Sequence, residues 1–375
     1  MSEKRRSILN EDGSCAEEFR NLVPDDDLLA IIRTILLNRV MDRRLMMLQR
    51  QGRLSFYMTS AGEEVVTVGT AYALWETDPI FLTYRELGAL LWRKVPLEAI
   101  MNQLIGNAQD INQGRQMPIH YCYREYHIPS VSSPVGTQLP HATGFGYAAR
   151  IRQTDQVALA FLGEGTASQG DFHTALNFSG VLNAQTIFMI RNNGYAISTP
   201  ESVQTKASSL AIRAEGYGIP GTQIDGNDLL MVVSAVREAA ERARSGGGPT
   251  LIEALTYRMG AHSSSDDPTR YRPDTEMKQW EQVDALARLR RHAKWRGIWT
   301  QPMEKEAWSD AEKAVTDMIS DCERWPPPPV ESLFDDVYER MPETLRVQKE
   351  EYMAFLRERK RYDDRIGGDE HDSGA

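Results

Sequence analysis

The sequence predicts an α/β protein whose parallel sheet is flanked by helices. Short apolar strand segments alternate with helical segments through the middle of the chain, an order that produces a parallel sheet with helices on both faces. One strand segment is apolar without interruption, and the strand segments stop near residue 275. The chain therefore divides into an N-terminal arm, residues 1–24, an α/β domain, residues 25–274, and a C-terminal helical extension, residues 275–375.

The first elements follow an irregular arm that ends at Pro24. Three aspartates, residues 25–27, suit the first turn of a helix that runs to about Gln51, with Gly52 at its C-terminal side. Apolar residues recur within it at helical spacing. Residues 79–84 then predict a short buried strand.

The central alternation runs from residue 137 to residue 257. The sequence predicts helices over 137–150, 171–182 and from 228 to about 245, with strands over 157–162, 186–190 and 250–257. After residue 275 we expect two or three charged helices, interrupted by the prolines at 326–329, which no helix interior tolerates. This extension should pack on the core or on another subunit.

Composition excludes several classes of protein. Hydrophobic residues make up 41% and charged residues 26% of the 375 residues, an ordinary balance for a globular protein. The net charge of −10 argues against a nucleic-acid partner, because phosphate binding normally rests on a basic surface. No stretch approaches the roughly 18 apolar residues of a membrane span. The three cysteines lie far apart, so we expect neither a disulfide framework nor a zinc cluster.

The strongest chemical pattern lies between residues 163 and 195. Gly163-Glu164-Gly165 follows one predicted strand and Asn192-Asn193 follows the next, with room between them for one helix and one strand. Ligands of open α/β sheets bind at these carboxyl ends. A carboxylate beside an amide oxygen suits Mg²⁺, while glycines and the next helix N-terminus let a diphosphate approach the backbone. The segment therefore predicts a site for a metal ion and a diphosphate.

Each part of this pattern has a plainer interpretation when it is taken alone. Gly-x-Gly after a strand is common, and Asn-Asn-Gly is also a turn sequence. Two arginines near the site, Arg85 and Arg191, could form salt bridges instead of binding phosphate. The combination at a spacing of one crossover favours the metal and diphosphate interpretation.

The same segments resemble a known family. Gly-Glu-Gly followed one crossover later by Asn-Asn is similar to the thiamine diphosphate motif, and GEGTASQGDFHTALNF and RNNGYAIST resemble α subunits of branched-chain 2-oxo acid dehydrogenases. These are the thiamine-diphosphate-dependent decarboxylating first component of a multienzyme complex. The resemblance continues from residue 40 onward through SFYMTSAGEE, YRELG, GRQMPIHY, SSPVGTQ, DGND, TYRMGAHSSSDDPTRYRP and FDDVYERMP. Pyruvate-type α subunits carry a glycine-rich segment in place of GRQMPIHY, which favours the branched-chain type.

The resemblance implies a thiamine-diphosphate-binding fold and a set of ligand contacts. Mg²⁺ would be held by Glu164, Asn193 and the carbonyl of Tyr195, and K⁺ by Ser132, Pro134, Thr137 and Gln138. Cofactor contacts would come from Tyr84, Arg85, Ser133, Val135, Gly163, Glu164, Gly165, Thr166, Arg191, Asn193 and His262. Guanidinium groups match phosphate oxygens in geometry. Thr83 and Thr166 depart from the family's usual glutamine and alanine; this puts cofactor affinity in doubt but removes no metal ligand.

The resemblance also implies a substrate pocket and two catalytic histidines. Phe56, Tyr84, Met117 and His120 would line an acyl pocket, and an apolar pocket with one or two polar groups suits a branched aliphatic 2-oxo acid. The alternative is that Phe56 and Met117 are ordinary core residues. His120 and His262 are the catalytic candidates, His262 as a diphosphate contact and as a proton donor during transfer to the lipoyl arm.

The loop that carries His262 also carries a candidate modification site. Ser263 stands where mitochondrial members of the family are phosphorylated and switched off, whereas Pro273 occupies the place of their second phosphorylated serine. We expect a bacterial-type protein in which Ser263 is unmodified but sensitive to charge. Charge pairs among Asp266, Asp267, Arg258 and Arg272 are expected to hold the loop together.

The implied reaction is that of a 3-methyl-2-oxobutanoate dehydrogenase. It would decarboxylate 3-methyl-2-oxobutanoate, 4-methyl-2-oxopentanoate and 3-methyl-2-oxopentanoate and pass the acyl group to the lipoyl group of a dihydrolipoyl acyltransferase. The family assembles as two α and two β subunits, and β supplies the glutamate that activates the cofactor, so the chain should be inactive alone. Two alternatives stay open: a pyruvate- or acetoin-type α subunit, and a non-catalytic scaffold paralogue.

The first residues bear on location. They are basic without the apolar core of a signal peptide, and acidic residues follow at once. We therefore expect the cytoplasm of a bacterium, or the mitochondrial matrix if a presequence has been removed.

Overall fold

A parallel sheet forms the centre of the molecule. The computed structural model describes residues 5–368; residues 1–4 and 369–375, which belong to the predicted arm and extension, lie outside the described residues. Five strands pair in the order β1-β2-β3-β7-β6, all parallel. Their bounds are β1 Ile80–Phe81, β2 Ala158–Gly163, β3 Thr186–Asn192, β6 Gly221–Asp225 and β7 Thr250–Leu255. The predicted α/β class is confirmed.

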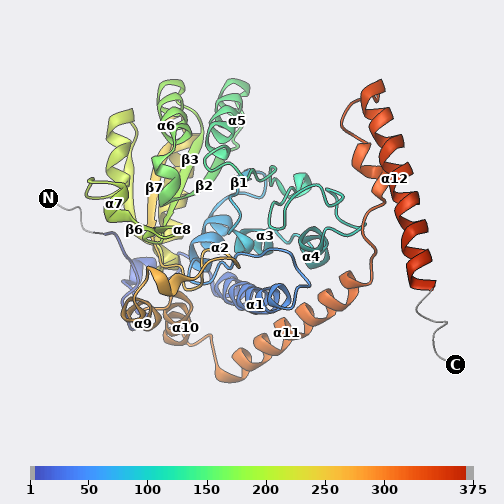
Figure 1. The fold of residues 1–375 in the computed structure, drawn as a ribbon. Helices are drawn as coiled ribbons and strands as arrows, with labels where there is room; N and C mark the ends of the chain where they lie inside the picture. Colours follow the sequence, from blue (N-terminus) through green and yellow to red (C-terminus); the bar gives the residue numbers. More distant parts are fainter. Residues whose placement is uncertain (1–4, 369–375) are drawn as a thin grey trace.

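Helices cover both faces of the sheet because successive strand residues point to opposite sides. Residues 158, 160 and 162 of β2 join one hydrophobic cluster with α5 (Gln138–Arg152) and α6 (Gly170–Leu182). Residues 159 and 161 join a second cluster with α1 (Asp25–Arg50), α2 (Glu64–Ala73) and α8 (Leu229–Arg244). Figure 1 shows α5 and α6 on one side of the strands, with α8 and α2 toward the other.

Several elements were not predicted, and each has a physical reason. Helix α2 is buried on nearly every side, so its sequence lacks the amphipathic period that marks a surface helix. Helices α3 (Leu87–Trp92) and α4 (Leu97–Ile105) are short. Strand β6 is half polar because it lies at the sheet edge, where Arg6 of the N-terminal arm forms a parallel bridge to Ile224.

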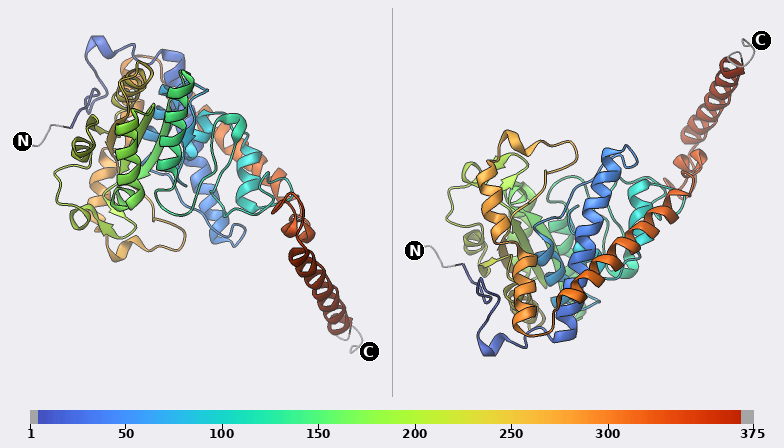
Figure 2. Two further views of the ribbon diagram at one scale, coloured as in Figure 1. Left: turned by 90° about the horizontal axis from the view of Figure 1, so that it is seen from above. Right: turned by 90° about the horizontal axis from the view of Figure 1, so that it is seen from below.

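As far as residue 368, the C-terminal extension has four α-helices rather than the two or three predicted. They are α9 (Asp274–Gln282), α10 (Ala285–Trp295), α11 (Gln301–Glu323) and α12 (Glu343–Gly368). Buried residues of α10 and α11 share the hydrophobic cluster of α1, whereas α12 stands away from the body in Figures 1 and 2. The division of the chain into three parts stays a prediction. None of the helices over residues 5–368 combines the length and apolarity that a membrane crossing needs.

Candidate active site

The register between β2 and β3 creates the site. Gly163 at the end of β2 pairs with Arg191 of β3, so the residues that follow the two strands emerge together at the carboxyl edge of the sheet. The backbone N–H of Asn193 donates to Oε2 of Glu164 at 3.3 Å. Both side chains are buried, with 3% of Glu164 and 8% of Asn193 exposed. The carboxylate and the amide thus lie together, as the strand spacing predicted.

The turn after β2 contains an element that the sequence did not predict, a short 3₁₀ helix, η3 (Glu164–Ser168). Helix α6 then runs over Gly170–Leu182, which confirms the helix predicted over 171–182. A Cβ on Gly165 would lie 2.6 Å from the Cβ of Ala196, whereas one on Gly163 would meet nothing within 4 Å. Close packing between the two loops therefore requires glycine at position 165 but not at position 163.

A cavity of about 360 Å³ opens at this edge of the sheet. It is lined by these predicted residues: Tyr84, Arg85, Ser132, Ser133, Val135, Gln138, Gly163, Glu164, Gly165, Thr166, Arg191, Asn193, Tyr195 and His262. Pro134 and Thr137 belong to the same loop without lining the cavity; the Thr137 hydroxyl donates to the Pro134 carbonyl at 3.0 Å. The structure therefore brings nearly all predicted cofactor and metal residues to one place.

Glu164 is a buried carboxylate that a cation would stabilise. Burial raises its pKa to about 7, and the backbone N–H groups of Glu164 and Asn193 offset this only in part. Among the described residues, no group of three or more His, Cys, Asp or Glu side chains could hold a metal ion. A metal here would rest on one carboxylate with amide and backbone oxygens, which are hard ligands suited to Mg²⁺.

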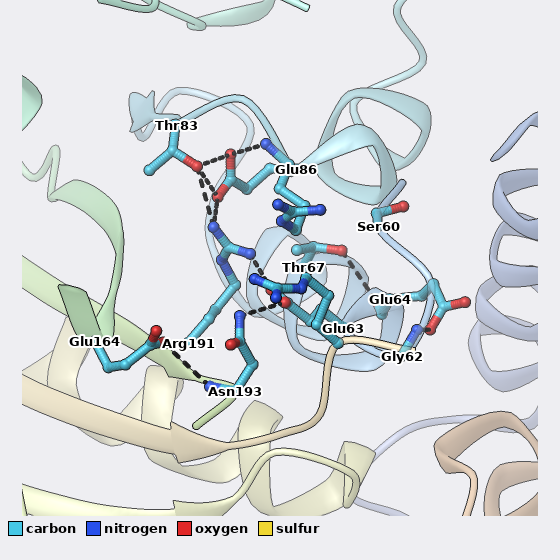
Figure 3. Close-up of polar contacts among 12 residues, drawn as sticks. Ser60, Gly62, Glu63, Glu64, Thr67, Thr83, Glu86, Glu164, Arg191 and Asn193 are labelled. Atoms are coloured by element: carbon cyan, nitrogen blue, oxygen red, sulfur yellow. Dashed lines mark hydrogen bonds and ion pairs between the residues drawn. The ribbon is translucent and has the colours of Figure 1, made fainter. Parts of the chain in front are cut away.

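Two buried glutamates hold Arg191 in place (Figure 3). The guanidinium forms ion pairs with Glu63 and Glu86 and donates to the Thr83 hydroxyl at 3.0 Å. Burial raises the pKa of Glu63, but Arg191 and Arg85 outweigh that effect, so the pKa is lowered and the carboxyl stays ionised. Arg191 thus forms the salt bridges that the sequence left as an alternative, and it still lines the cavity.

Arg85 and Arg258 bring positive charge to the cavity, and within residues 5–368 neither forms an ion pair with a carboxylate. Arg85 donates to the carbonyls of Thr59 and His262, and Arg258 donates to the carbonyl of Ile197 at 2.9 Å and to the hydroxyl of Tyr271 at 3.0 Å. A guanidinium bonded only to neutral groups keeps its charge available for an anion. Together these two arginines form a corner suited to phosphate.

His262 lies between these two arginines as a neutral imidazole. Burial, together with the charges of Arg85 and Arg258, lowers its pKa to about 3. The Nδ1 atom lies 3.4 Å from Arg85 Nη2 and 3.3 Å from Arg258 Nη1. Because guanidinium groups only donate, Nδ1 accepts and the ring proton resides on Nε2. His262 therefore offers one N–H donor and no charge.

Hydrogen bonds, not charge pairs, hold the loop that carries His262. Asp266 accepts from the His262 N–H at 2.7 Å and from the Tyr271 hydroxyl at 2.6 Å. Arg272 donates to the carbonyls of residues 258–260. Within the described residues the predicted ion pairs of Asp266 and Asp267 with Arg258 and Arg272 do not form, because carbonyls left free by the irregular backbone take up the guanidinium donors.

The predicted substrate pocket is only partly assembled in this chain. Tyr84 lines the cavity, and Nε2 of His120 contacts the Ser133 hydroxyl at 2.5 Å. Phe56 is half-buried against the main core cluster, and 52% of Met117 is exposed. The structure does not bring Phe56 and Met117 to the cavity.

Sequence reasoning missed residues that do not line the cavity but hold predicted site residues in place. Glu63 and Glu86 were not singled out, although Glu63 directly precedes helix α2, which is almost fully buried and carries no charge after Glu64. A charge next to such a segment indicates a buried partner. Gln103 was also missed: its amide donates to the Met117 carbonyl at 2.7 Å and accepts from the Ile119 N–H at 3.0 Å. Nothing in its local sequence distinguishes it.

The fold and these groups define a class of protein: an α/β protein with a carboxylate and an amide placed for a divalent cation, beside two guanidinium groups that bond only to neutral groups of the described chain and are placed for phosphate. Comparisons with known proteins agree with this class. The model of the dehydrogenase E1 component family matches residues 32–331. The chain belongs to this family, which confirms the predicted thiamine-diphosphate-binding fold.

Individual relatives are similar over most of their length. The chain is 44% identical over 335 residues to the mitochondrial 2-oxoisovalerate dehydrogenase subunit alpha of Bos taurus, which covers 89% of this chain and 74% of that protein. It is also 44% identical over 335 residues to the Homo sapiens protein of that name, covering 89% of this chain and 75% of that protein. Identity to the mitochondrial 2-oxoisovalerate dehydrogenase subunit alpha 1 of Arabidopsis thaliana is 40% over 351 residues, which covers 91% of this chain and 73% of that protein.

Proposed function

We propose that this chain is the α subunit of a branched-chain 2-oxo acid dehydrogenase that uses thiamine diphosphate. The observation that carries the proposal is the meeting of Glu164 and Asn193 at the sheet edge, beside Arg85 and Arg258. The relatives support the substrate class, since 2-oxoisovalerate is another name for 3-methyl-2-oxobutanoate. The substrates would be this acid and its two branched homologues.

The residues present fit a diphosphate with Mg²⁺. Glu164, the Asn193 amide oxygen and the Tyr195 carbonyl would hold the ion, and its charge would remove the penalty that burial places on the Glu164 carboxylate. Arg85, Arg258 and Nε2–H of His262 would bind the diphosphate, with the backbone of 165 and 166. Arg191 would contribute less, because two carboxylates already share its charge.

When bound, thiamine diphosphate supplies the carbanion chemistry that lets carbon dioxide leave a 2-oxo acid. The chain would hold the diphosphate end. An anion bound by Arg85 and Arg258 would offset the two charges that lower the pKa of His262. The imidazole would then be better able to hold and pass on a proton during acyl transfer.

A second cation, K⁺, is proposed at Ser132, Pro134, Thr137 and Gln138. Hydroxyl, carbonyl and amide oxygens suit a hard cation. The Gln138 amide nitrogen donates to the Phe161 carbonyl at 2.9 Å, which leaves its oxygen as the free acceptor. The ion would order the loop that places Ser133 and Val135 beside the cofactor.

The acyl pocket is proposed at Phe56, Tyr84, Met117 and His120. Only Tyr84 of these four lines the cavity in the single chain. Half-exposed Met117 would become part of an enclosed apolar wall once a partner subunit covers it.

The partner in this proposal is a β subunit, in an assembly of two α and two β chains. Of the described residues that line the cavity, Glu164 is the only carboxylate, so a glutamate that activates the cofactor would have to come from β. A lipoyl-bearing acyltransferase would take the acyl group. The assembly would work in the cytoplasm of a bacterium, or in the mitochondrial matrix in a eukaryote; subcellular fractionation tests this placement.

The test is decarboxylation by the co-expressed αβ pair. The ratio of kcat/KM for 3-methyl-2-oxobutanoate over pyruvate should exceed about tenfold, the discrimination expected when an apolar pocket gains a methylene contact. Glu164→Ala in the same complex should abolish the reaction. A preference for pyruvate would indicate a pyruvate-type subunit. A wild-type complex that is inactive both with and without Mg²⁺ would indicate a scaffold.

A further inference from the structure

The Asn193 amide has two ends of nearly the same shape and opposite chemistry. Its oxygen can hold a cation, whereas its NH₂ group cannot. In the structure Nδ2 donates to Oε1 of Glu63 at 2.9 Å, and Oδ1 accepts from the Tyr195 N–H at 3.2 Å. The orientation of this amide therefore decides whether the site has its second ligand.

The Glu63 carboxylate is placed to set the orientation of the Asn193 amide. It is 1% exposed, and its other oxygen, Oε2, pairs with Arg191, which is itself held by Glu86 (Figure 3). An ionised carboxylate only accepts hydrogen bonds, so it admits the NH₂ end of Asn193 and rejects the oxygen end. We propose that Glu63 is a positioning residue that turns the Asn193 oxygen toward the metal site, an inference that rests on the proposed function.

An isosteric change at Glu63 exposes this role. In Glu63→Gln the new amide must offer its oxygen to Arg191, because a guanidinium only donates and charge-assisted bonds are the stronger ones. Its NH₂ group then faces Asn193. The glutamine NH₂ and the Tyr195 N–H then compete for the one Asn193 oxygen, and each time the oxygen turns toward the glutamine, the Asn193 NH₂ group enters the metal site. The substitution keeps the shape of the site but removes an oxygen ligand.

The experiment measures thiamine diphosphate binding by calorimetry on the co-expressed αβ complex at a series of Mg²⁺ concentrations. Glu63→Gln should raise the Mg²⁺ concentration for half-maximal binding by about 10- to 100-fold, the effect that is common when a residue that orients a metal ligand is replaced. The matched control is Glu86→Gln, which takes a charge from the same Arg191 guanidinium without contacting Asn193. Its shift should be several-fold smaller. Equal shifts in the two variants would overturn the inference and assign the effect to the charge on Arg191.

A rescue gives a second, independent readout. In Glu63→Gln combined with Asn193→Asp, the new aspartate has an oxygen for the glutamine NH₂ and another for the metal. The double variant should therefore need less Mg²⁺ than either Glu63→Gln or Asn193→Asp alone, since Asn193→Asp alone sets two carboxylates face to face. A misfolded Glu63→Gln chain would not be restored in this way, and absence of rescue overturns the inference. Wild-type protein that binds no thiamine diphosphate with Mg²⁺ would instead refute the proposed function.

Discussion

Replacing Glu164 by glutamine should stabilise the metal-free protein even as it destroys the metal site. Glu164 is 3% exposed, and burial raises its pKa from an ordinary 4.5 to about 7. Between these values the folded state binds the proton more tightly than the unfolded state, so stability falls as the pH rises through this window. At about 1.4 kcal/mol per pKa unit, ionised Glu164 costs on the order of 3 kcal/mol above pH 7. Glu164→Gln should therefore raise the free energy of unfolding of the metal-free protein by up to that amount.

The assay is thermal melting of the co-expressed αβ complex in EDTA at about pH 5 and about pH 8.5, on either side of the window. The variant should melt at a higher temperature than the wild type at the upper pH and at nearly the same temperature at the lower pH. Glu64→Gln is the matched control: Glu64 is equally buried but pairs with Arg39 at 2.8 Å, so its neutralisation should destabilise. Equal melting of wild type and Glu164→Gln at the upper pH would refute the reasoning.

Three further substitutions test the site, the pocket and the loop. Asn193→Ala removes an oxygen ligand and should abolish Mg²⁺-dependent cofactor binding while the chain still assembles with β; wild-type affinity by calorimetry would contradict the site. Met117→Ala should change the preference for 3-methyl-2-oxobutanoate over pyruvate by about 1–3 kcal/mol, and an unchanged kcat/KM ratio would leave Met117 as a surface residue. Ser263→Glu places a charge at a buried position in the loop of Asp266 and should lower overall activity and expose residues near 262 to proteolysis. Full activity with an uncut loop would make Ser263 an ordinary loop residue.

The fold could be predicted where the sequence carries an unmistakable period or apolar run. Strands β2, β3 and β7 are buried on both faces, so they are rich in apolar residues that are visible in the sequence, continuous in β2 and interrupted by Glu253 in β7. Helix α2 and strand β6 could not be predicted in this way. The first is buried on nearly every side and the second is a half-polar edge strand, and in both cases tertiary neighbours decide the structure.

The site could be predicted only as far as its residues share a local pattern. Glu164 and Asn193 follow two strands at the spacing of one crossover, so topology alone places them together. Glu63 and Glu86 lie on another part of the chain and meet Arg191 only in the folded protein. The exposure of Met117 likewise depends on the surface of the fold, which GRQMPIHY does not specify.

The cavity combines two kinds of unsatisfied charge, and this makes a specific prediction for ligand removal. Glu164 is a buried carboxylate with a raised pKa, and among the described residues Arg85 and Arg258 donate to carbonyls and a hydroxyl rather than to carboxylates. Mg²⁺ alone would leave the charges of the two arginines uncompensated, and a diphosphate alone would add negative charge to the cavity that Glu164 lines. Each ligand should therefore strengthen binding of the other by an equal factor. The rise in melting temperature of the αβ complex with Mg²⁺ and thiamine diphosphate together should exceed the sum of the two separate rises, and EDTA should remove most of it. Additive shifts would show that the carboxylate and the arginines act independently.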